Sequence, residues 1–118
     1  MLIYFEMISE NMNINFKVFG KKEGNVLIFP DKSTPNTMIN VTIGDNEIII
    51  ERTGNVNMRQ VFKLKEKMEG YYKNNLGLEF KTASFTKELY VRENSINVLY
   101  EHYFENEWQS SNKLKIIF

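Results

Sequence analysis

Arg52 is the side chain whose type and position most suggest chemistry. It follows the apolar run Ile48–Ile50 by two positions and directly precedes the turn residues Thr53-Gly54-Asn55. A guanidinium at the mouth of a barrel can hold a carboxylate or a phosphate through two parallel hydrogen bonds. The same group can instead close a loop by donating to backbone carbonyls, or pair with a glutamate. Both interpretations stay open, and Arg52 is the first candidate for a ligand contact.

His102 is the only histidine of the chain. One imidazole can act as a base or as a single metal ligand. A metal site needs further ligands that the spacing does not supply. Glu101 and Glu105 are near in sequence but belong to the opposite face of an extended strand. We expect a structural or half-exposed histidine that can contact a ligand, and a hydrolase-like pairing with a carboxylate is the remaining enzymatic alternative.

Tyrosines and one glutamine complete the candidate ligand-binding residues. Tyr71, Tyr72 and Tyr100 can orient a ligand through their hydroxyls, or pack in a barrel wall with the hydroxyl at the rim. Of these we select Tyr71 and Tyr100. Gln60 lies in line with its alternating neighbours, so an inward amide there needs a partner or a water. A shift of one residue in register would place it in solvent instead.

Signatures of known catalytic and cofactor sites are missing. The chain has no P-loop, no dinucleotide-binding glycine pattern, no Gly-x-Ser-x-Gly turn and no zinc-ligand spacing. We therefore predict no catalytic residue, no metal and no cofactor. The leading hypothesis is a non-enzymatic domain that binds a small molecule in or at the mouth of a barrel. The alternative is a solid barrel that binds a protein or forms a homo-oligomer through exposed aromatics such as Tyr103 and Trp108.

Apolar residues recur at every second position along most of the chain, which is typical of half-buried strands. Such runs are Ile14–Val18, Ile39–Ile43, Val56–Leu64, Leu76–Thr82 and Ile96–Phe104. One segment has a rival interpretation, because Val61, Leu64 and Met68 could form a helix face. The unbroken alternation favours strand. We also expect Glu69-Gly70 to interrupt the chain before a short strand begins at Tyr71.

Short turns separate these runs and predict about 8–10 strands in a single domain over residues 1–118. Sequential hairpins imply an up-and-down antiparallel arrangement. Closing that sheet removes its free edges, so the fold class predicted is a small all-β, antiparallel barrel. A single domain of this length is large enough to bury a hydrophobic core.

Composition limits the partners and the location. Fifteen basic and fifteen acidic residues give a net charge of zero, which indicates neither a nucleic-acid nor a membrane partner. Lys63, Lys65 and Lys67 could follow an RNA backbone, but the nearby glutamates favour a solvated face. The absence of cysteine fits a reducing cytosol. With no basic leader and no long apolar run, we expect a cytoplasmic protein.

The order of motifs from Asn25 onward resembles the YwiB-like family of bacterial proteins, a domain of unknown function. The resemblance rests on Arg52-Thr53-Gly54-Asn55-Val56-Asn57-Met58 with Phe62, on Gly70-Tyr71, on Gly77–Thr82, on Ile96–Tyr100 and on Lys113–Ile116. It covers about three-quarters of the chain and implies a calycin-type barrel related in shape to lipocalins. It implies no activity. Phe29-Pro30-Asp31 replaces the family's tyrosine-glutamate pair, so a ligand role tied to that pair does not carry over.

Overall fold

A computed structural model describes residues 1–118 as eleven β-strands without a helix. The strands are β1 Leu2–Ser9, β2 Met12–Phe19, β3 Lys21–Glu23, β4 Val26–Pro30, β5 Thr37–Ile43, β6 Glu47–Gly54, β7 Asn57–Lys63, β8 Lys67–Lys73, β9 Glu79–Arg92, β10 Ser95–Phe104 and β11 Glu107–Ile117. The predicted all-β class is therefore confirmed. The structure contains no helix of the length and hydrophobicity that a membrane span requires.

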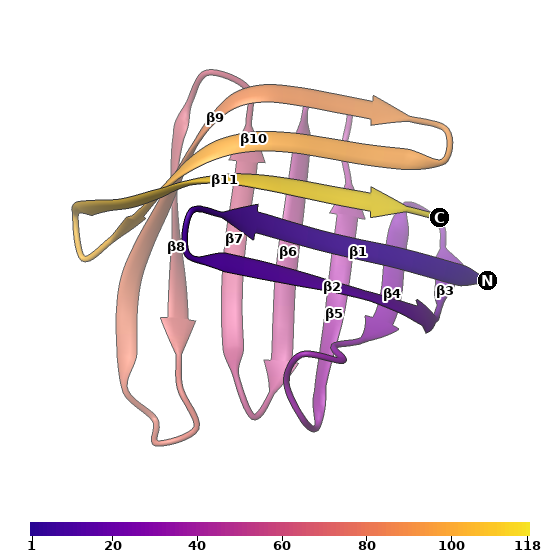
Figure 1. Ribbon diagram of the computed structural model, residues 1–118, viewed down its shortest axis with the longest axis horizontal. Helices are drawn as coiled ribbons and strands as arrows, with labels where there is room; N and C mark the ends of the chain where they lie inside the picture. Colours follow the sequence, from indigo (N-terminus) through magenta and orange to yellow (C-terminus); the bar gives the residue numbers. More distant parts are fainter.

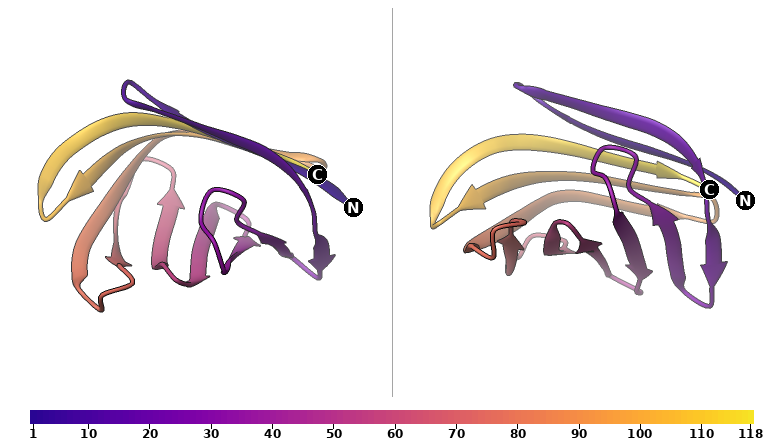
Figure 2. Two further views of the ribbon diagram at one scale, coloured as in Figure 1. Left: turned by 60° about the horizontal axis from the view of Figure 1, so that its bottom comes forward. Right: turned by 90° about the horizontal axis from the view of Figure 1, so that it is seen from below.

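All eleven strands belong to one antiparallel sheet that curls into a nearly closed barrel (Figure 1). From β3 to β11 each strand pairs with the next one in the chain. The first strand β1 then pairs with the last strand β11, and β2 lies at the far edge. Figure 2 shows β1, β2, β10 and β11 arching over β4–β8. The up-and-down arrangement expected from the hairpins is confirmed.

Gly20 joins the two edges of this sheet. The edge strands β2 and β3 are consecutive in sequence, and only Gly20 separates them. A Cβ atom at Gly20 would lie 2.6 Å from the carbonyl oxygen of Ile28 and 2.7 Å from Cβ of Phe29. Its backbone also donates to the Met1 carbonyl at 2.9 Å. The absence of a side chain therefore lets the bent β2–β3 segment approach β4 and draw the barrel together.

The interior is divided into an apolar part and a more polar part. Seventeen buried residues form one hydrophobic cluster, with inward side chains from alternate positions of the strands. Its aromatic centre places Phe5 against Phe16, with ring centroids 5.1 Å apart, and Phe29 lies 6.1 Å from Phe5. Buried polar residues, including Gln60, Thr82 and Asn112, face the remaining volume. This division leaves one end of the barrel available for polar contacts.

The strand count exceeds the predicted range because two strands were not recognised. Residues 2–9 form β1, whose inward Ile3, Phe5 and Met7 alternate with outward side chains. The segment Lys21–Glu23 is the short strand β3, and its three residues are exposed. Without apolar residues such a short edge strand has no periodic pattern to reveal it.

The turn between β7 and β8 lies at a different position from the one predicted. Both segments are strands, so the preference for strand over helix is confirmed. The chain turns at Lys65, which has a φ of 62°, and not at Glu69-Gly70. Gly70 lies inside β8, where a Cβ atom would be 2.1 Å from the Arg59 carbonyl oxygen. Glycine is required here because the two strands approach each other closely. Lys63, Lys65 and Lys67 do not share one strand face, because the turn at Lys65 separates β7 from β8.

The 14-residue strand β9 contains a bulge, which allows it to pair with β8 in its first part and with β10 along its length. Leu99 pairs with Glu88 and Tyr100 pairs with Thr86, which leaves Lys87 as the extra residue. Bulges of this kind bend a strand and increase its twist. The first part of β9 pairs with β8 and the whole strand follows β10 (Figure 1).

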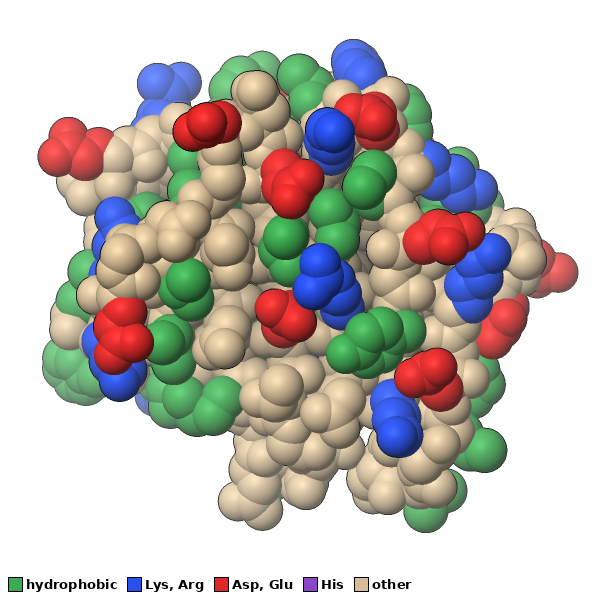
Figure 3. Space-filling view, turned by 180° about the vertical axis from the view of Figure 1, so that it is seen from behind, with side chains coloured by type: hydrophobic (Ala, Val, Ile, Leu, Met, Phe, Trp, Pro, Cys, Tyr) green, Lys and Arg blue, Asp and Glu red, His purple; other side chains and the backbone are tan.

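Charges of opposite sign are mixed on the outer face seen in Figure 3, where acidic and basic side chains lie side by side. Arg59 pairs with Glu51 at 3.4 Å, and Lys81 pairs with Glu69 at 3.0 Å. All four side chains are substantially exposed, so these pairs contribute little stability. The view displays no extended field of one sign on this face.

Candidate functional site

A cavity of about 410 Å³ occupies the polar end of the barrel interior. Inward residues from β1, β2 and β6–β11 line it. Four of the five candidate ligand-binding residues line this one cavity: Arg52, Gln60, Tyr100 and His102. They come from three strands, β6, β7 and β10, and alternation within each strand directs them inward. The structure thus brings together residues that lie far apart in the sequence.

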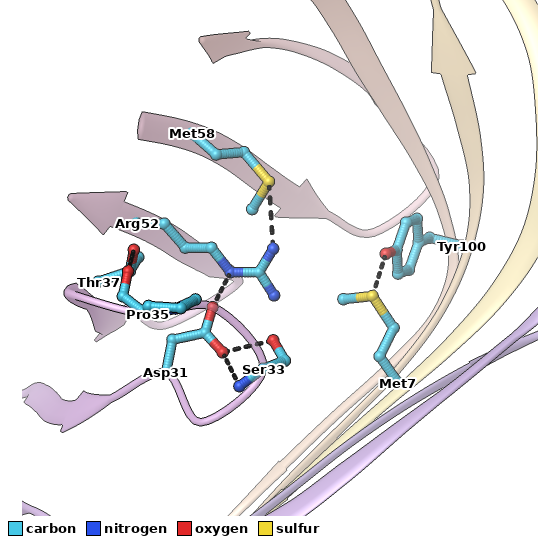
Figure 4. Close-up of polar contacts among 8 residues, drawn as sticks. All are labelled: Met7, Asp31, Ser33, Pro35, Thr37, Arg52, Met58 and Tyr100. Carbon is cyan, nitrogen blue, oxygen red and sulfur yellow. Dashed lines mark hydrogen bonds and ion pairs between the residues drawn. The ribbon is translucent and has the colours of Figure 1, made fainter. Parts of the chain in front are cut away.

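Arg52 in β6 pairs with Asp31, which directly follows β4 (Figure 4). The Nε atom of Arg52 lies 3.1 Å from Oδ2 of Asp31, and their side chains are 13% and 0% exposed. The other carboxylate oxygen, Oδ1, accepts hydrogen bonds from the Ser33 backbone N–H at 2.8 Å and from its hydroxyl at 2.5 Å. Arg52 therefore has a carboxylate partner, which is an aspartate in a loop rather than the glutamate or backbone carbonyl considered from sequence.

The remaining nitrogens of Arg52 are poorly satisfied by the protein. Nη1 donates to Sδ of Met58 at 3.8 Å, and a thioether is a weak acceptor. Nε and Oδ2 of Asp31 are close enough for an ion pair but do not have hydrogen-bond geometry. A guanidinium carries five N–H donors, so most of the hydrogen-bonding capacity of Arg52 is unused by other side chains.

Tyr100 belongs to a short polar network at the wall of the cavity. Its hydroxyl donates to Sδ of Met7 at 3.7 Å and accepts from Nδ2 of Asn112 at 3.2 Å. The Ser110 hydroxyl in turn donates to Oδ1 of Asn112 at 2.6 Å. Burial raises the pKa of Tyr100, while the amides of Asn112 and Gln60 and the charge of Arg52 lower it to a smaller extent. The hydroxyl accordingly stays protonated and can act as a donor.

Besides Nε of Arg52, two buried atoms of the cavity residues have no hydrogen-bond partner. These are Oε1 of Gln60 and Nδ1 of His102. Burial lowers the pKa of His102, so its imidazole is neutral near pH 7. No carboxylate bonds to His102, and the acid–base pair that a hydrolase-like role requires is not formed. Both open atoms can serve as contacts for a bound molecule.

Tyr71, the fifth candidate, lies outside the cavity. It pairs with Arg59 and Lys81 on the outer face of the sheet, whereas the adjacent Tyr72 lines the cavity. Tyr71 therefore does not join the other four candidates at the cavity. The physical reason is that β8 runs without interruption through Gly70, so Met68, Gly70 and Tyr72 share the inward face.

Sequence reasoning missed Asp31 and three methionines of the site. Met7, Met12 and Met58 line the cavity. Arg52 is the only charged residue among the lining residues. No group of three or more His, Cys, Asp or Glu side chains is arranged to hold a metal ion. The cavity thus combines one cation and several neutral polar groups with a flexible apolar lining.

Fold and cavity together define the class: a small, nearly closed antiparallel β-barrel with a partly polar cavity at one end. The chain belongs to the family described as "Domain of unknown function (DUF1934)", whose model matches residues 6–116. Its structure is similar to the crystal structure of the YwiB protein from Bacillus subtilis, with a TM-score of 0.74 and 16% sequence identity. The match covers 98% of this chain and 87% of that chain. The predicted YwiB-like family is thereby confirmed, and the similarity in structure shows the fold alone. No match was found among curated proteins.

Proposed function

We propose that this protein is a non-enzymatic binding domain that holds a small molecule in the cavity at the polar end of the barrel. The proposal rests mainly on Arg52, a largely buried cation that has Asp31 as its counter-ion. Its terminal nitrogens face the cavity, and the Met58 thioether is their only side-chain acceptor. Buried polar groups normally have good partners, and leaving a charged group without them is costly. A bound molecule supplies the missing acceptors.

Further support comes from the size and the lining of the cavity. Its volume falls within the range of about 300–1,000 Å³ that is usual for small-molecule sites. Mixed apolar walls with a few convergent polar groups are also usual for such sites. The proposal includes a calycin-like ligand-binding barrel and a cytoplasmic location, the latter favoured by the cysteine-free composition.

Methionine methyl groups provide a direct test. The chain has six methionines; Met7, Met12 and Met58 line the cavity, whereas Met1 and Met38 are exposed outside it. Protein labelled with ¹³C-methyl methionine is screened by NMR against a library of acids, amides, amines and neutral aromatics. We expect binding compounds to shift the three cavity methyl signals and to leave Met1 and Met38 unchanged. If no compound of the library shifts the signals of the three cavity methionines, the proposal is overturned.

A matched pair of variants locates the binding. Thr82 is 5% exposed and lines the cavity, so Thr82→Phe fills part of it. Thr42→Phe in β5 makes the same change away from the cavity. Binding should be lost in the first variant and kept in the second. Ser110→Leu, also in the lining, serves if Thr82→Phe does not fold. Unchanged binding in folded cavity variants would contradict the proposed location.

Protein binding or self-association is a second candidate function, favoured by the exposed Trp108 and the half-buried Tyr103 beside it. Trp108 is 51% exposed and lies opposite Tyr103 across β10 and β11. The ammonium of Lys67 sits 4.0 Å from the centre of the Tyr103 ring. Exposed aromatics of this kind occur at protein interfaces. Light scattering on wild type and Trp108→Ala tests it: a concentration-dependent dimer that the variant abolishes supports the candidate, and a strict monomer argues against self-association.

A further inference from the structure

We propose that the ligand of the cavity carries a single carboxylate, bound by Arg52 and Tyr100, with an apolar chain behind it. This inference rests on the proposed function and specifies its ligand class. The central observation is that the two strongest donors of the cavity both point at methionine sulfurs. Nη1 of Arg52 donates to Met58 at 3.8 Å, and the Tyr100 hydroxyl donates to Met7 at 3.7 Å (Figure 4).

Sulfur is a poor substitute for oxygen as the acceptor of such donors. Hydrogen bonds from a guanidinium to a carboxylate are charge-assisted and are roughly twice as strong as neutral ones. Both methionine side chains are flexible and can move aside at low cost. Oxygen acceptors from a ligand would therefore replace the two sulfurs, and the displaced methionines would pack against its apolar part.

The position of Asp31 leaves the outer edge of the guanidinium available. Asp31 approaches from the Nε side, and its second oxygen is occupied by Ser33. Figure 4 shows the terminal nitrogens of Arg52 on the side that faces Tyr100 and Met7. This fork has the geometry that binds a planar carboxylate through two hydrogen bonds. Asp31 thus holds the arginine in place while its terminal nitrogens serve the ligand.

Charge favours a carboxylate over a phosphate group. Arg52 is the only charged residue of the lining, and Asp31 already balances part of its charge. A phosphate monoester brings a charge of about −1.5 to −2 at neutral pH. Most of that charge would be buried without a counter-ion, which is strongly unfavourable. A carboxylate carries only one negative charge, so its binding would bury less charge without a counter-ion.

The other lining residues suit an apolar chain with one polar end. Ile14, Phe104 and the three cavity methionines provide the apolar surface. Gln60 adds a buried amide beside Tyr100, and its NH₂ group is a further donor for the same carboxylate. The carboxylate therefore has up to three donors on different strands.

Three eight-carbon compounds with different polar ends test the inference: octanoate, octanamide and octyl phosphate. Binding is followed by the methionine methyl signals and by titration calorimetry. We expect octanoate to shift Met7, Met12 and Met58 and to bind about tenfold or more tightly than octanamide, the value of one charge-assisted hydrogen bond. It should also bind more tightly than octyl phosphate. Tighter binding of the phosphate would overturn the choice of carboxylate.

Variants at the ion pair separate recognition from folding. Arg52→Met should remove the preference for octanoate over octanamide. The double variant Asp31→Asn/Arg52→Met leaves no unpaired charge and should show the same loss in a stable fold. Asp31→Asn alone keeps the arginine and should strengthen octanoate binding, because the positive charge is no longer offset. A purely structural Arg52 would leave the octanoate preference unchanged in the double variant, contrary to the inference.

The outcomes distinguish this inference from the proposed function. If octanoate and octanamide bind equally to wild type, or if only other library compounds shift the cavity methyls, the carboxylate inference fails and the binding function stands. If no compound of the whole library shifts them, both fail.

Discussion

Asp31 and Arg52 lie 3.1 Å apart in the barrel interior, where the carboxylate is fully buried and the guanidinium nearly so. One residue follows β4 and the other lies in β6, so the pair connects a loop to the wall of the barrel. Its guanidinium also faces the cavity. The pair therefore links the conformation of residues 31–36 to the state of the site.

Removing one member of this pair should strongly destabilise the protein. Arg52→Met leaves the buried Asp31 carboxylate without a counter-charge, which costs about 3–5 kcal/mol in comparable cases. The double variant Asp31→Asn/Arg52→Met removes both charges and should recover most of that loss. Urea unfolding followed by circular dichroism measures both values. Equal stability of wild type and Arg52→Met would show that the carboxylate is not buried as described.

A side chain at Gly20 should weaken the closure of the barrel. In Gly20→Ala the new methyl group would meet the Ile28 carbonyl oxygen at 2.6 Å, so β2–β3 must move away from β4. Overpacking of this kind costs about 1–3 kcal/mol. Gly24→Asn is the control, because its surroundings are empty within 4 Å and asparagine tolerates its φ of +60°. Faster hydrogen exchange in β2 and β4 should accompany the loss in Gly20→Ala but not in the control.

His102 should make the protein less stable in mild acid. Burial places its folded-state pKa below the usual 6.5, so the unfolded chain binds the proton more readily. Stability is then constant above the unfolded pKa and falls as pH drops from there toward the folded pKa. His102→Gln should flatten this slope in urea unfolding measured between about pH 7.5 and pH 5.5. An identical slope in wild type and variant would mean that the imidazole is accessible to protons in the folded state.

Glu101 should affect the stability of the protein at a lower pH than His102 does. The Ser111 hydroxyl, which donates at 2.5 Å, and then Lys87 lower the pKa of this carboxylate below its usual 4.5. The ionised form is stabilised in the folded state, so its contribution is present above the unfolded pKa and is lost as pH falls through the folded pKa. Ser111→Ala should move the acid-unfolding midpoint to higher pH. Glu93→Gln, at an exposed turn, should leave the midpoint unchanged.

Alternation allowed much of the fold and most of the candidate site to be predicted from sequence. In a strand the face of a side chain depends only on position, so Gln60, Tyr100 and His102 could each be placed on the same face as their apolar neighbours without coordinates. Closure of the sheet into a barrel then brings these three side chains together at one cavity. Arg52 joined them because it continues the inward set of Ile48 and Ile50 in β6.

The missed features depend on tertiary contacts. Asp31 lies in a loop, and no local pattern indicates that it reaches Arg52 from another part of the chain. The choice of Tyr71 over Tyr72 depended on whether Gly70 breaks the strand. Glycine marks both a turn and a close strand contact, and only the Arg59 backbone distinguishes them.

The pairing of β1 with β11 sets an order for biosynthesis. Tyr4 through Ile8 align with Ile117 through Lys113, so this part of the ladder cannot form until the final strand has left the ribosome. Until then Ile3, Phe5 and Met7, which are buried in the finished barrel, lack the neighbours that β11 provides. Translation proceeds at about 5–20 residues per second, so the nascent hairpin of β1 and β2 carries an uncovered apolar face for several seconds. That interval is when a chaperone has most to bind and when aggregation competes most strongly with folding.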